Sequence, residues 1–309
     1  MRPAYNRQLE FSTGCPVGQL TPELERKLTT AVDRMPAFPR SVQKVLELTR
    51  NINCLPKDLV GVIEKDPVMT MKILKVINSA YYSLPNKITS VNQSVVYLGI
   101  NTIKNLALSF AAVGILPRVN TAGFDIQRYL VHSLATANVA RLLCAGYAKG
   151  EADPGDCYVA GLLHDFGKVV FAQFMAGEFR QALMKGVTEG LPLYQVERQM
   201  IGVDHGVVGA LLAKKWQFPE ALVECIRDHH AENAAPSAMM DCLRVADQIC
   251  RGAGLQTGGL LAEEAPPWEG QVPAAGRFGD DLGKVVSGLG DLSKIIADAT
   301  MFVQVDGGK

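Results

Sequence analysis

The sequence predicts an all-α protein, and three features of the 309-residue chain support this fold class. Apolar residues recur at the i, i+4, i+7 and i+8 spacing of a packed helix, as at Met69, Ile73, Val76 and Ile77. Residues that favour helix starts stand before several of these runs. No alternating apolar and polar segment of useful length occurs, so strands are not expected.

Helix starts in the first half of the chain follow from cap residues and prolines. Thr21-Pro22-Glu23 combines a cap residue, a proline in the first turn and an acid near the positive end of the helix dipole. Ser41 is predicted to cap the run VQKVLELTR. The other helices predicted in this half begin at Pro56, begin at Pro67 after Asp66, and run over 91–98 and 101–115.

A break at 117–123 separates these helices from a second, more apolar set. Asp125 is predicted to cap a long helix over 126–148. Residues 153–156, Asp-Pro-Gly-Asp, are predicted to form a turn, followed by one apolar helix over 157–174. Further helices are expected over 178–189, 192–201, 205–216, 219–229 and 237–252, and one or two over 281–302 after a Gly- and Pro-rich loop at 253–280.

Composition bounds the functions that this chain can have. Lys plus Arg and Asp plus Glu both number 31, so the formal net charge is zero and gives no reason to expect binding to nucleic acid. The mean hydropathy is +0.10, but no apolar run of about 18 residues and no apolar signal core is present. Seven scattered cysteines favour free thiols in a cytoplasmic protein. Four lie among aliphatic residues and are predicted to be core residues: Cys144, Cys225, Cys242 and Cys250.

The histidines of the chain are distributed unevenly. All five lie after the break at 117–123, and each falls within or at the end of a predicted helix. Two aspartates also lie in apolar helical runs. Imidazole and carboxylate together form the ligand set that suits Mn, Fe, Zn or Ni. The candidate metal ligands are therefore His132, His164, Asp165, His205, His229, His230 and Asp247.

The dipeptide His164-Asp165 constrains the geometry of such a site. Neighbours on a straight helix diverge by about 100°, so both side chains can face one site only at a bend, at a helix end or between two metals. Gly167 could supply the irregularity at a bend. Alternatively, Asp165 could bridge two ions that together activate a water molecule. Lys168, about one turn from His164, would then bind a substrate phosphate or stabilise the carboxylates.

Each of these residues also has a simpler interpretation when it is taken alone. A single buried histidine is more often a hydrogen-bonded core residue than a metal ligand. Asp247 could cap or bond a neighbouring helix, and His229-His230 could stabilise the negative end of a helix dipole. Only the joint pattern favours a metal site.

Several separated motifs occur in the order found in a known family. The front half contains MPAFPRSVQKVLEL, IEKDPVMTMKILKVINSAYY and a stretch ending SVVYLGINTIKNLAL, and the second half contains HDFGK and HGVVGALLAKKWQFPEALVECIRDHH. Over residues 25–252 the chain resembles the HDOD domain, the HD-related output domain of bacterial signalling proteins, within the HD superfamily of metal-dependent phosphohydrolases. The resemblance implies an HD-superfamily helical core with an N-terminal helical HDOD subdomain.

The resemblance also divides the chain and assigns the candidate ligands. It implies a leader over 1–24, an HDOD domain over 25–252 and a C-terminal loop and helices over 253–309, with the domain split into an N-terminal subdomain at 25–117 and a metal-binding core at 124–252. One metal would be bound by His132, His164, Asp165 and Asp247, and the second by Asp165, His205 and one of His229 or His230. The pair is expected to be Fe or Mn, with Ni, Zn or Mg as alternatives. Lys168 matches the family lysine that meets a substrate phosphate.

Two departures from related HD-GYP phosphodiesterases bear on the activity. The segment AENAAPS follows His230, without the Gly-Tyr-Pro segment of those enzymes, which argues against hydrolysis of cyclic-di-GMP. Arg128 lies one turn before His132, where some of those enzymes have a glutamate, and its charge would oppose a third metal.

Three functions are consistent with these features. The first is an HDOD signalling protein with a complete dinuclear metal site, which acts through a protein partner and binds neither membrane nor nucleic acid. The alternative is an active metal-dependent phosphohydrolase or phosphodiesterase on a nucleotide or related phosphoester, in which Asp165 and Lys168 would be catalytic. The third is a di-iron site that senses oxygen or redox state.

Overall fold

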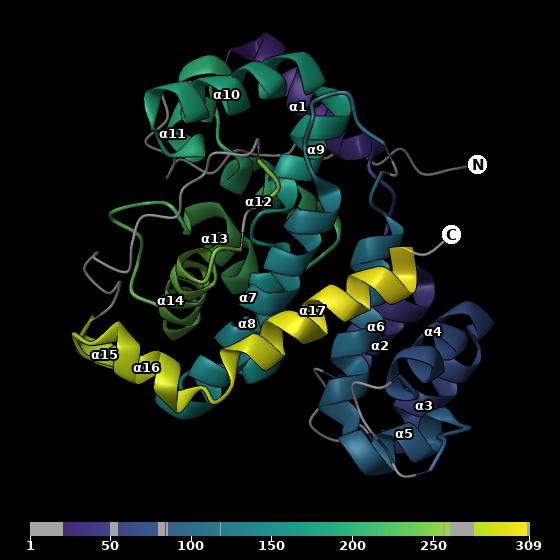
Figure 1. Ribbon diagram of the computed structural model, residues 1–309. Helices are drawn as coiled ribbons and strands as arrows, with labels where there is room; N and C mark the ends of the chain where they lie inside the picture. Colours follow the sequence, from purple (N-terminus) through teal and green to yellow (C-terminus); the bar gives the residue numbers. More distant parts are fainter. Residues whose placement is uncertain are drawn as a thin grey trace, which may run out of the picture.

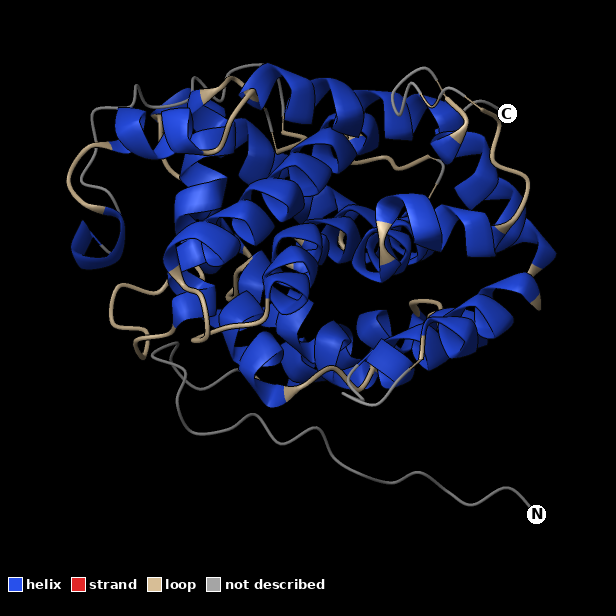
Figure 2. Cartoon of the chain, turned by 90° about the horizontal axis from the view of Figure 1, so that it is seen from below, coloured by secondary structure: helices blue, strands red, loops and turns tan. Residues whose placement is uncertain are grey.

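The computed structural model describes residues 21–49, 55–79, 84, 86–117, 119–255, 257–259 and 275–307. Within these ranges every regular element is a helix, and Lys149 and Ala152 form an isolated β-bridge (Figure 2). The prediction of an all-α fold is therefore confirmed. The predicted leader up to residue 20 and the middle of the predicted loop at 253–280 lie outside the described residues.

Seventeen helices follow one another along the described chain. They are α1 (Pro22–Arg34), α2 (Arg40–Thr49), α3 (Pro56–Glu64), α4 (Pro67–Ile77), α5 (Val91–Leu98), α6 (Ile100–Gly114), α7 (Ile126–Tyr147), α8 (Pro154–Leu163), α9 (Phe166–Phe174), α10 (Ala176–Glu189), α11 (Leu193–Met200), α12 (His205–Lys215), α13 (Glu220–Asp228), α14 (Ala238–Gly252), α15 (Ala275–Phe278), α16 (Leu282–Gly288) and α17 (Leu292–Gly307).

The helices form two groups that the last helix joins (Figure 1). In the front group, α2 to α6 pack against one another. In the second group, α7 packs against α8 and α14, and α12 packs against α9 and α13. Helix α17 lies along α7 and also contacts α4, so it bridges both groups. Helix α1 is the first of the described helices, but it packs on α9 and α12 of the second group.

The segment after α1 is fixed to the end of α12. The Lys215 Nζ donates to three backbone carbonyls near the end of α1, at distances of 2.8 to 2.9 Å. The Trp216 Nε1 donates to the Pro36 carbonyl at 3.1 Å, and the Trp216 and Phe38 rings meet edge to face at 4.5 Å. These contacts hold the first described segment on the helix whose opposite end carries His205.

Most of the predicted helix starts are confirmed. The side chains of Thr21, Asp66 and Asp125 accept backbone N–H groups of the following first turn at 3.0 to 3.3 Å. Ser41 is an exception, because α2 begins at Arg40 and Ser41 lies inside it. The Ser41 hydroxyl instead donates to Asp66 Oδ2 at 2.7 Å, so it links α2 to the start of α4.

Two predictions around the apolar run at 157–174 are wrong. Residues 153–156 are the start of α8 and not a separate turn, because Asp153 accepts two backbone N–H groups of the first helical turn. The run itself forms two helices, α8 and α9, and His164 and Asp165 form the junction between them. The dipeptide therefore lies at a helix end, one of the positions from which both side chains can reach a single site.

Two glycines beside this junction let the helices approach to backbone contact. A Cβ at Gly161 would lie 2.6 Å from Ala137 Cα on α7, and a Cβ at Gly167 would lie 1.9 Å from the carbonyl oxygen of His205 on α12. Gly167 is not among the glycines with positive φ. Its role is therefore to leave space, and the backbone irregularity expected of it is not found.

Burial of the cysteines agrees with the prediction. Cys144, Cys225, Cys242 and Cys250 are buried free thiols, and Cys157 is buried as well. None of the described helices combines the length and the apolar character that crossing a lipid bilayer requires.

The crossing at Gly167 can be tested by adding a single methyl group. Gly167→Ala should lower the free energy of unfolding by about 1–3 kcal/mol or more, because the new Cβ would collide with backbone atoms of α12. Gly177→Ala on α10 is the matched control, since its Cβ would meet no heavy atom within 4 Å, and it should leave stability unchanged or raise it by up to about 1 kcal/mol. Chemical denaturation measures both. Equal losses in the two variants would contradict the space-filling argument.

Candidate metal centre

The structure brings all seven candidate ligands and Lys168 together in the second group of helices. His132 lies within α7 and Asp247 within α14. The other five ligands lie at or beside helix ends: His164 ends α8, Asp165 precedes α9, His205 begins α12, and His229 and His230 follow α13. Because these ends converge, residues that are far apart in the sequence face a common space.

Asp165 lies at the centre of this arrangement. Its side chain is 2% exposed, and its two carboxylate oxygens face two different groups of residues. Asp165 Oδ2 lies 3.4 Å from His164 Nε2, whereas Oδ1 lies 3.0 Å from His205 Nε2. The ligand atoms within each group lie within 4.8 Å of one another, and Asp165 belongs to both groups.

The first group of donor side chains, which we call the first donor group, comes from α7, α14 and the junction after α8. His132 Nε2 lies 3.1 Å from Asp247 Oδ1, and His164 Nε2 lies 3.8 Å from the same oxygen. Both imidazoles thus point their Nε2 atoms at one carboxylate, while His164 also faces Asp165. His132, His164 and Asp165 bring their ligand atoms within 4.8 Å of one another, and the Asp247 carboxylate faces both of these imidazoles.

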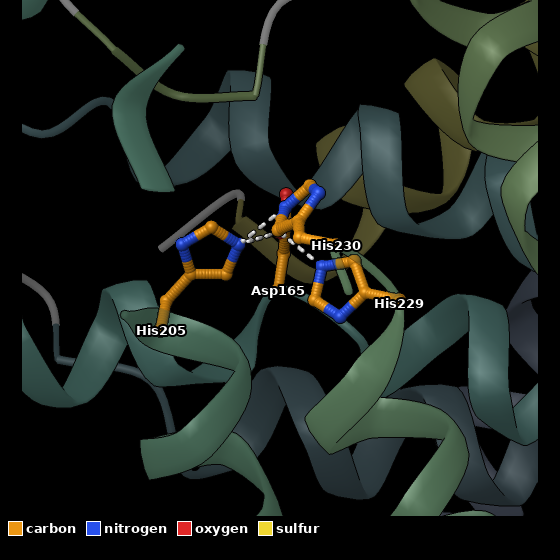
Figure 3. Close-up of side chains that lie close together, drawn as sticks. All are labelled: Asp165, His205, His229 and His230. Atoms are coloured by element: carbon orange, nitrogen blue, oxygen red, sulfur yellow. Dashed lines mark hydrogen bonds and ion pairs between the residues drawn. The ribbon is translucent and has the colours of Figure 1, made fainter. Parts of the chain in front are cut away.

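The second donor group brings Asp165 together with histidines at the start of α12 and after the end of α13 (Figure 3). His229 Nε2 lies 3.8 Å from Asp165 Oδ1, and His230 Nε2 lies 3.0 Å from His205 Nε2. The ring of Tyr194 stacks on His230 with centroids 4.4 Å apart and planes inclined by 12°. His229 and His230 both face Asp165, so this group brings three imidazoles to one carboxylate oxygen.

Hydrogen bonds at Nδ1 orient three of the histidines. His164 Nδ1 is 2.8 Å from the Gly161 carbonyl oxygen, and His229 Nδ1 is 2.7 Å from the Ile226 carbonyl oxygen. A carbonyl can only accept, so each Nδ1–H donates and leaves a lone pair on Nε2, which faces the centre. In this orientation Nε2 of each ring is the atom that would bind a cation.

Glu197 orients the third histidine and is a functional residue that sequence reasoning missed. It is fully buried on α11, and its Oε2 lies 2.6 Å from His205 Nδ1 and 2.9 Å from the His205 backbone nitrogen. A carboxylate behind a ligating histidine raises the basicity of the ligand. The sequence gives no signal for this role, because Glu197 looks like a polar residue on an amphipathic helix.

Two cations balance the carboxylates. Lys168 Nζ lies 2.7 Å from Asp165 Oδ2, and Arg251 Nη2 lies 2.8 Å from Asp247 Oδ2. Burial alone would raise the pKa of Asp165, but His164, Lys168 and His205 lower it well below its usual range. Burial opposes ionisation of Asp247 in the same way, and Arg251 and His132 hold the pKa of that carboxyl below its usual range. Both aspartates are therefore ionised at neutral pH.

The three histidines of the second donor group differ in protonation. Burial favours the neutral form of His205, but the Glu197 carboxylate and then Asp165 raise the pKa of His205 to about 9. Burial, followed by the neighbouring imidazoles, lowers the pKa of His229 and lowers that of His230 well below the usual range. His229 and His230 are consequently neutral near pH 7, which is the form that binds metals.

One buried atom indicates that the donors fit a cation. His229 Nε2 is buried and has no hydrogen-bond partner, although it points toward Asp165 Oδ1. A buried nitrogen lone pair without a partner is unfavourable, and a divalent ion between His229, Asp165 and His205 would satisfy it. The donor set of imidazoles and carboxylates suits a transition metal such as Fe or Mn.

Access to the centre is narrow. His132, His164, His205 and Asp165 are at most 2% exposed, whereas His230 is partly exposed and the Arg251 side chain is 40% exposed. Solvent therefore approaches from the side of His230 and Arg251. Arg128 points elsewhere, because its exposed side chain pairs with Asp125 at 3.3 Å.

Comparisons with known proteins agree with this fold. A family model described as the HDOD domain matches residues 35–232. An uncharacterized protein of Treponema pallidum (strain Nichols) is 25% identical over 216 residues, which are 70% of this chain and 41% of the Treponema protein. The chain thus spans less than half the length of that relative.

Two solved structures have the same arrangement of helices. An HDOD domain protein with unknown function from Geobacter sulfurreducens is 26% identical with a TM-score of 0.71, covering 91% of this chain and 96% of that chain. A proposed signal transduction protein from Marinobacter aquaeolei VT8 has a TM-score of 0.74 at 20% identity, covering 92% of this chain and 66% of that chain. The second likeness is one of fold alone.

The role of Glu197 leads to a prediction about metal affinity. Glu197→Gln should weaken metal binding by roughly 10–100-fold, because the amide keeps a hydrogen-bond acceptor for His205 but removes the charge that raises ligand basicity. Metal titration of the chelator-treated protein measures the affinity. Glu224→Gln on α13 is the control, because Glu224 is exposed. A purely structural role for Glu197 would instead lower the melting temperature of the metal-free protein and leave the affinity unchanged.

Proposed function

This chain belongs to the HDOD family, and from that premise we propose that it is a signalling output protein built around a dinuclear metal centre of HD type. His132, His164 and Asp247 would bind one ion, His205 with His229 or His230 would bind the other, and Asp165 would bridge them. Fe or Mn is the proposed pair, on the chemistry of the donors.

The observation that carries this proposal is the position of the Asp165 carboxylate. Its Oδ2 faces His164 and its Oδ1 faces His205, so the two oxygens belong to two separate donor groups. A carboxylate that served only as a partner for Lys168 would need no such division. The Lys168 ammonium and the surrounding imidazoles keep Asp165 ionised and hold it in place.

The burial of the donors favours a binding role over rapid turnover. A divalent pair would supply charge that organises the carboxylates and imidazoles and, in an enzyme, would polarise a phosphoester and a water molecule. The nearly complete burial of His132, His164 and Asp165 leaves little room for a large substrate beside them. The same burial suits a centre whose occupancy fixes the relative positions of α7, α8 and α14.

Exposed apolar residues on the front group support a protein partner. Val68 and Met71 on α4 are 59% and 60% exposed, and Val96 and Tyr97 on α5 are 77% and 56% exposed. Helices α4 and α5 pack against each other, so these side chains come from neighbouring elements. Exposed apolar side chains gathered in one region are typical of surfaces that bind other proteins.

The second candidate is a metal-dependent phosphohydrolase acting on a nucleotide or related phosphoester. It is favoured by Lys168, whose ammonium lies 2.7 Å from Asp165 beside both donor groups. In that role Lys168 would bind a phosphate oxygen, and Arg251, on the more accessible side of the centre, would contribute a second cation.

Metal binding is tested through stability. A ligand that binds the native state alone stabilises it by mass action, by about 2.7 kcal/mol when its free concentration is about 100 times its dissociation constant. A chelator should therefore lower the melting temperature of the wild type and of the exposed control Asp280→Ala, but not that of Asp165→Ala. The metal content of the purified proteins should fall in Asp165→Ala alone. If neither chelator nor added metal changes the melting temperature of the wild type, the dinuclear centre is excluded.

Phosphodiester hydrolysis separates the two candidate functions. For the signalling protein, the metal-loaded wild type and Lys168→Met should hydrolyse bis(4-nitrophenyl) phosphate no faster than Asp165→Ala does. Release of 4-nitrophenol measures the rate. Turnover that requires both Asp165 and Lys168 would establish the hydrolase in place of the signalling protein, while leaving the proposed metal centre intact.

A further inference from the structure

A second group of potential metal ligands lies outside the histidine and aspartate centre. The Sγ atoms of Cys144, Cys157 and Cys242 lie within 4.8 Å of one another, and all three residues are fully buried. The residues come from α7, α8 and α14, three helices that pack against one another. Cys144 lies in the last turn of α7, whereas Cys157 and Cys242 lie near the starts of α8 and α14. We call these three residues the thiol cluster.

The thiol cluster is close to the end of the helix bundle. The short turn from α7 to α8 passes over it, and Cys144 Sγ donates to the Ala152 carbonyl at 3.4 Å. Helix α15 lies over the same end, where Arg277 pairs with Asp241 at 3.1 Å and with Glu151 at 2.7 Å. The cluster therefore lies beside the turn between α7 and α8 and near Arg277 of the four-residue helix α15.

The sulfur spacing suits a single ion. Zinc and similar ions bind thiolates at about 2.3 Å, so three sulfurs around one ion form a triangle with sides of about 4 Å. The observed separations lie within 4.8 Å, so small side-chain movements would close the triangle. Three helices contribute one sulfur each, so the spacing follows from tertiary packing.

The oxygen donors next to the cluster are already engaged. Asp153 caps α8 by accepting the backbone N–H groups of Gly155 and Asp156, and Asp241 pairs with Arg277. A three-sulfur site with its neighbouring carboxylates engaged favours a soft ion of low coordination number over a hard ion or one that requires four ligands.

Burial and hydrogen bonds within the cluster shift the pKa values of its three thiols. Burial raises the pKa of the Cys144 thiol. Cys157 donates a hydrogen bond to Cys242, which raises the pKa of Cys157 and lowers that of Cys242. The nearby Arg277 guanidinium also favours the Cys242 thiolate and would offset part of the charge of a loaded site.

We propose that Cys144, Cys157 and Cys242 form a second metal site, which binds Cu(I) through three thiolates. Three Cu–S bonds would form as the three S–H protons pass to solvent, and copper would remain Cu(I), so that no oxidant or reductant takes part. The proposal is independent of the histidine and aspartate centre, because the two sites share no residue.

The test uses the full chain, reduced and free of oxygen, with Cu(I) delivered from a coloured Cu(I) chelator of known affinity. The wild type should take up about one Cu(I) ion and develop ultraviolet thiolate-to-copper charge-transfer absorption, since soft thiolates select this ion. Cys157→Ala and Cys242→Ala should each lose at least about tenfold in affinity and most of the absorption. Cys225→Ala, which removes a buried thiol outside the cluster, should behave as the wild type. Asp165→Ala should do so as well, which separates this site from the histidine centre.

Alkylation of the wild-type protein gives a second readout that does not depend on variants that fold. Cu(I) should protect Cys144, Cys157 and Cys242 from alkylation during partial denaturation and leave Cys225 unprotected, as measured by mass spectrometry of peptides. Equal protection of all four, or equal copper uptake by wild type and folded Cys157→Ala, would show that the cluster is core packing only.

Discussion

The second group of helices depends on one buried carboxylate. Asp165 is 2% exposed and ionised, and an ionised group in a protein interior is costly unless charges and hydrogen bonds surround it. Lys168, three imidazoles and the turn between α8 and α9 meet this requirement. A continuous helix would turn His164 and Asp165 about 100° apart, and these two residues instead form the junction between α8 and α9. The junction lies next to the close approach of Gly167 to α12, the helix that carries His205.

Helix ends build the rest of the site. The last carbonyls of a helix lack intrahelical partners, and His164 and His229 both use this property. Each ends a helix, and each donates Nδ1–H to the carbonyl three residues earlier, on Gly161 and Ile226. The same bond that completes the helix end fixes the tautomer and directs Nε2 toward Asp165. One local arrangement, used twice, therefore prepares a ligand in each donor group.

Cap residues in the sequence predicted most of the helix starts, because both depend on contacts within one helical turn. Caps such as Asp66 and Asp125 act within one turn, so the residues around them are sufficient to locate the helix starts. The joint pattern of five histidines and two aspartates indicated one site, because so many polar groups in apolar helices must share partners. Glu197 and Ser41 could not be assigned in this way, since their partners, His205 and Asp66, are chosen by how helices pack. The same limit applies to the thiol cluster: the burial of Cys144 and Cys242 was predicted, but the burial of Cys157 and the gathering of the three residues were not.

The thiol cluster and the histidine and aspartate centre lie at different positions along the same helices and differ in ligand chemistry. Cys157 lies seven residues before His164 on α8, and Cys242 lies five residues before Asp247 on α14. Imidazole and carboxylate bind borderline and hard ions, whereas thiolates bind soft ones, so an ion suited to one cluster competes poorly for the other. Helices α7 and α8 contribute residues to both clusters, and α14 contributes Cys242 to one and Asp247, which faces His132 and His164, to the other. An ion at the thiol cluster would tie together the starts of α8 and α14 and so stiffen the same helices that position His164 and Asp247.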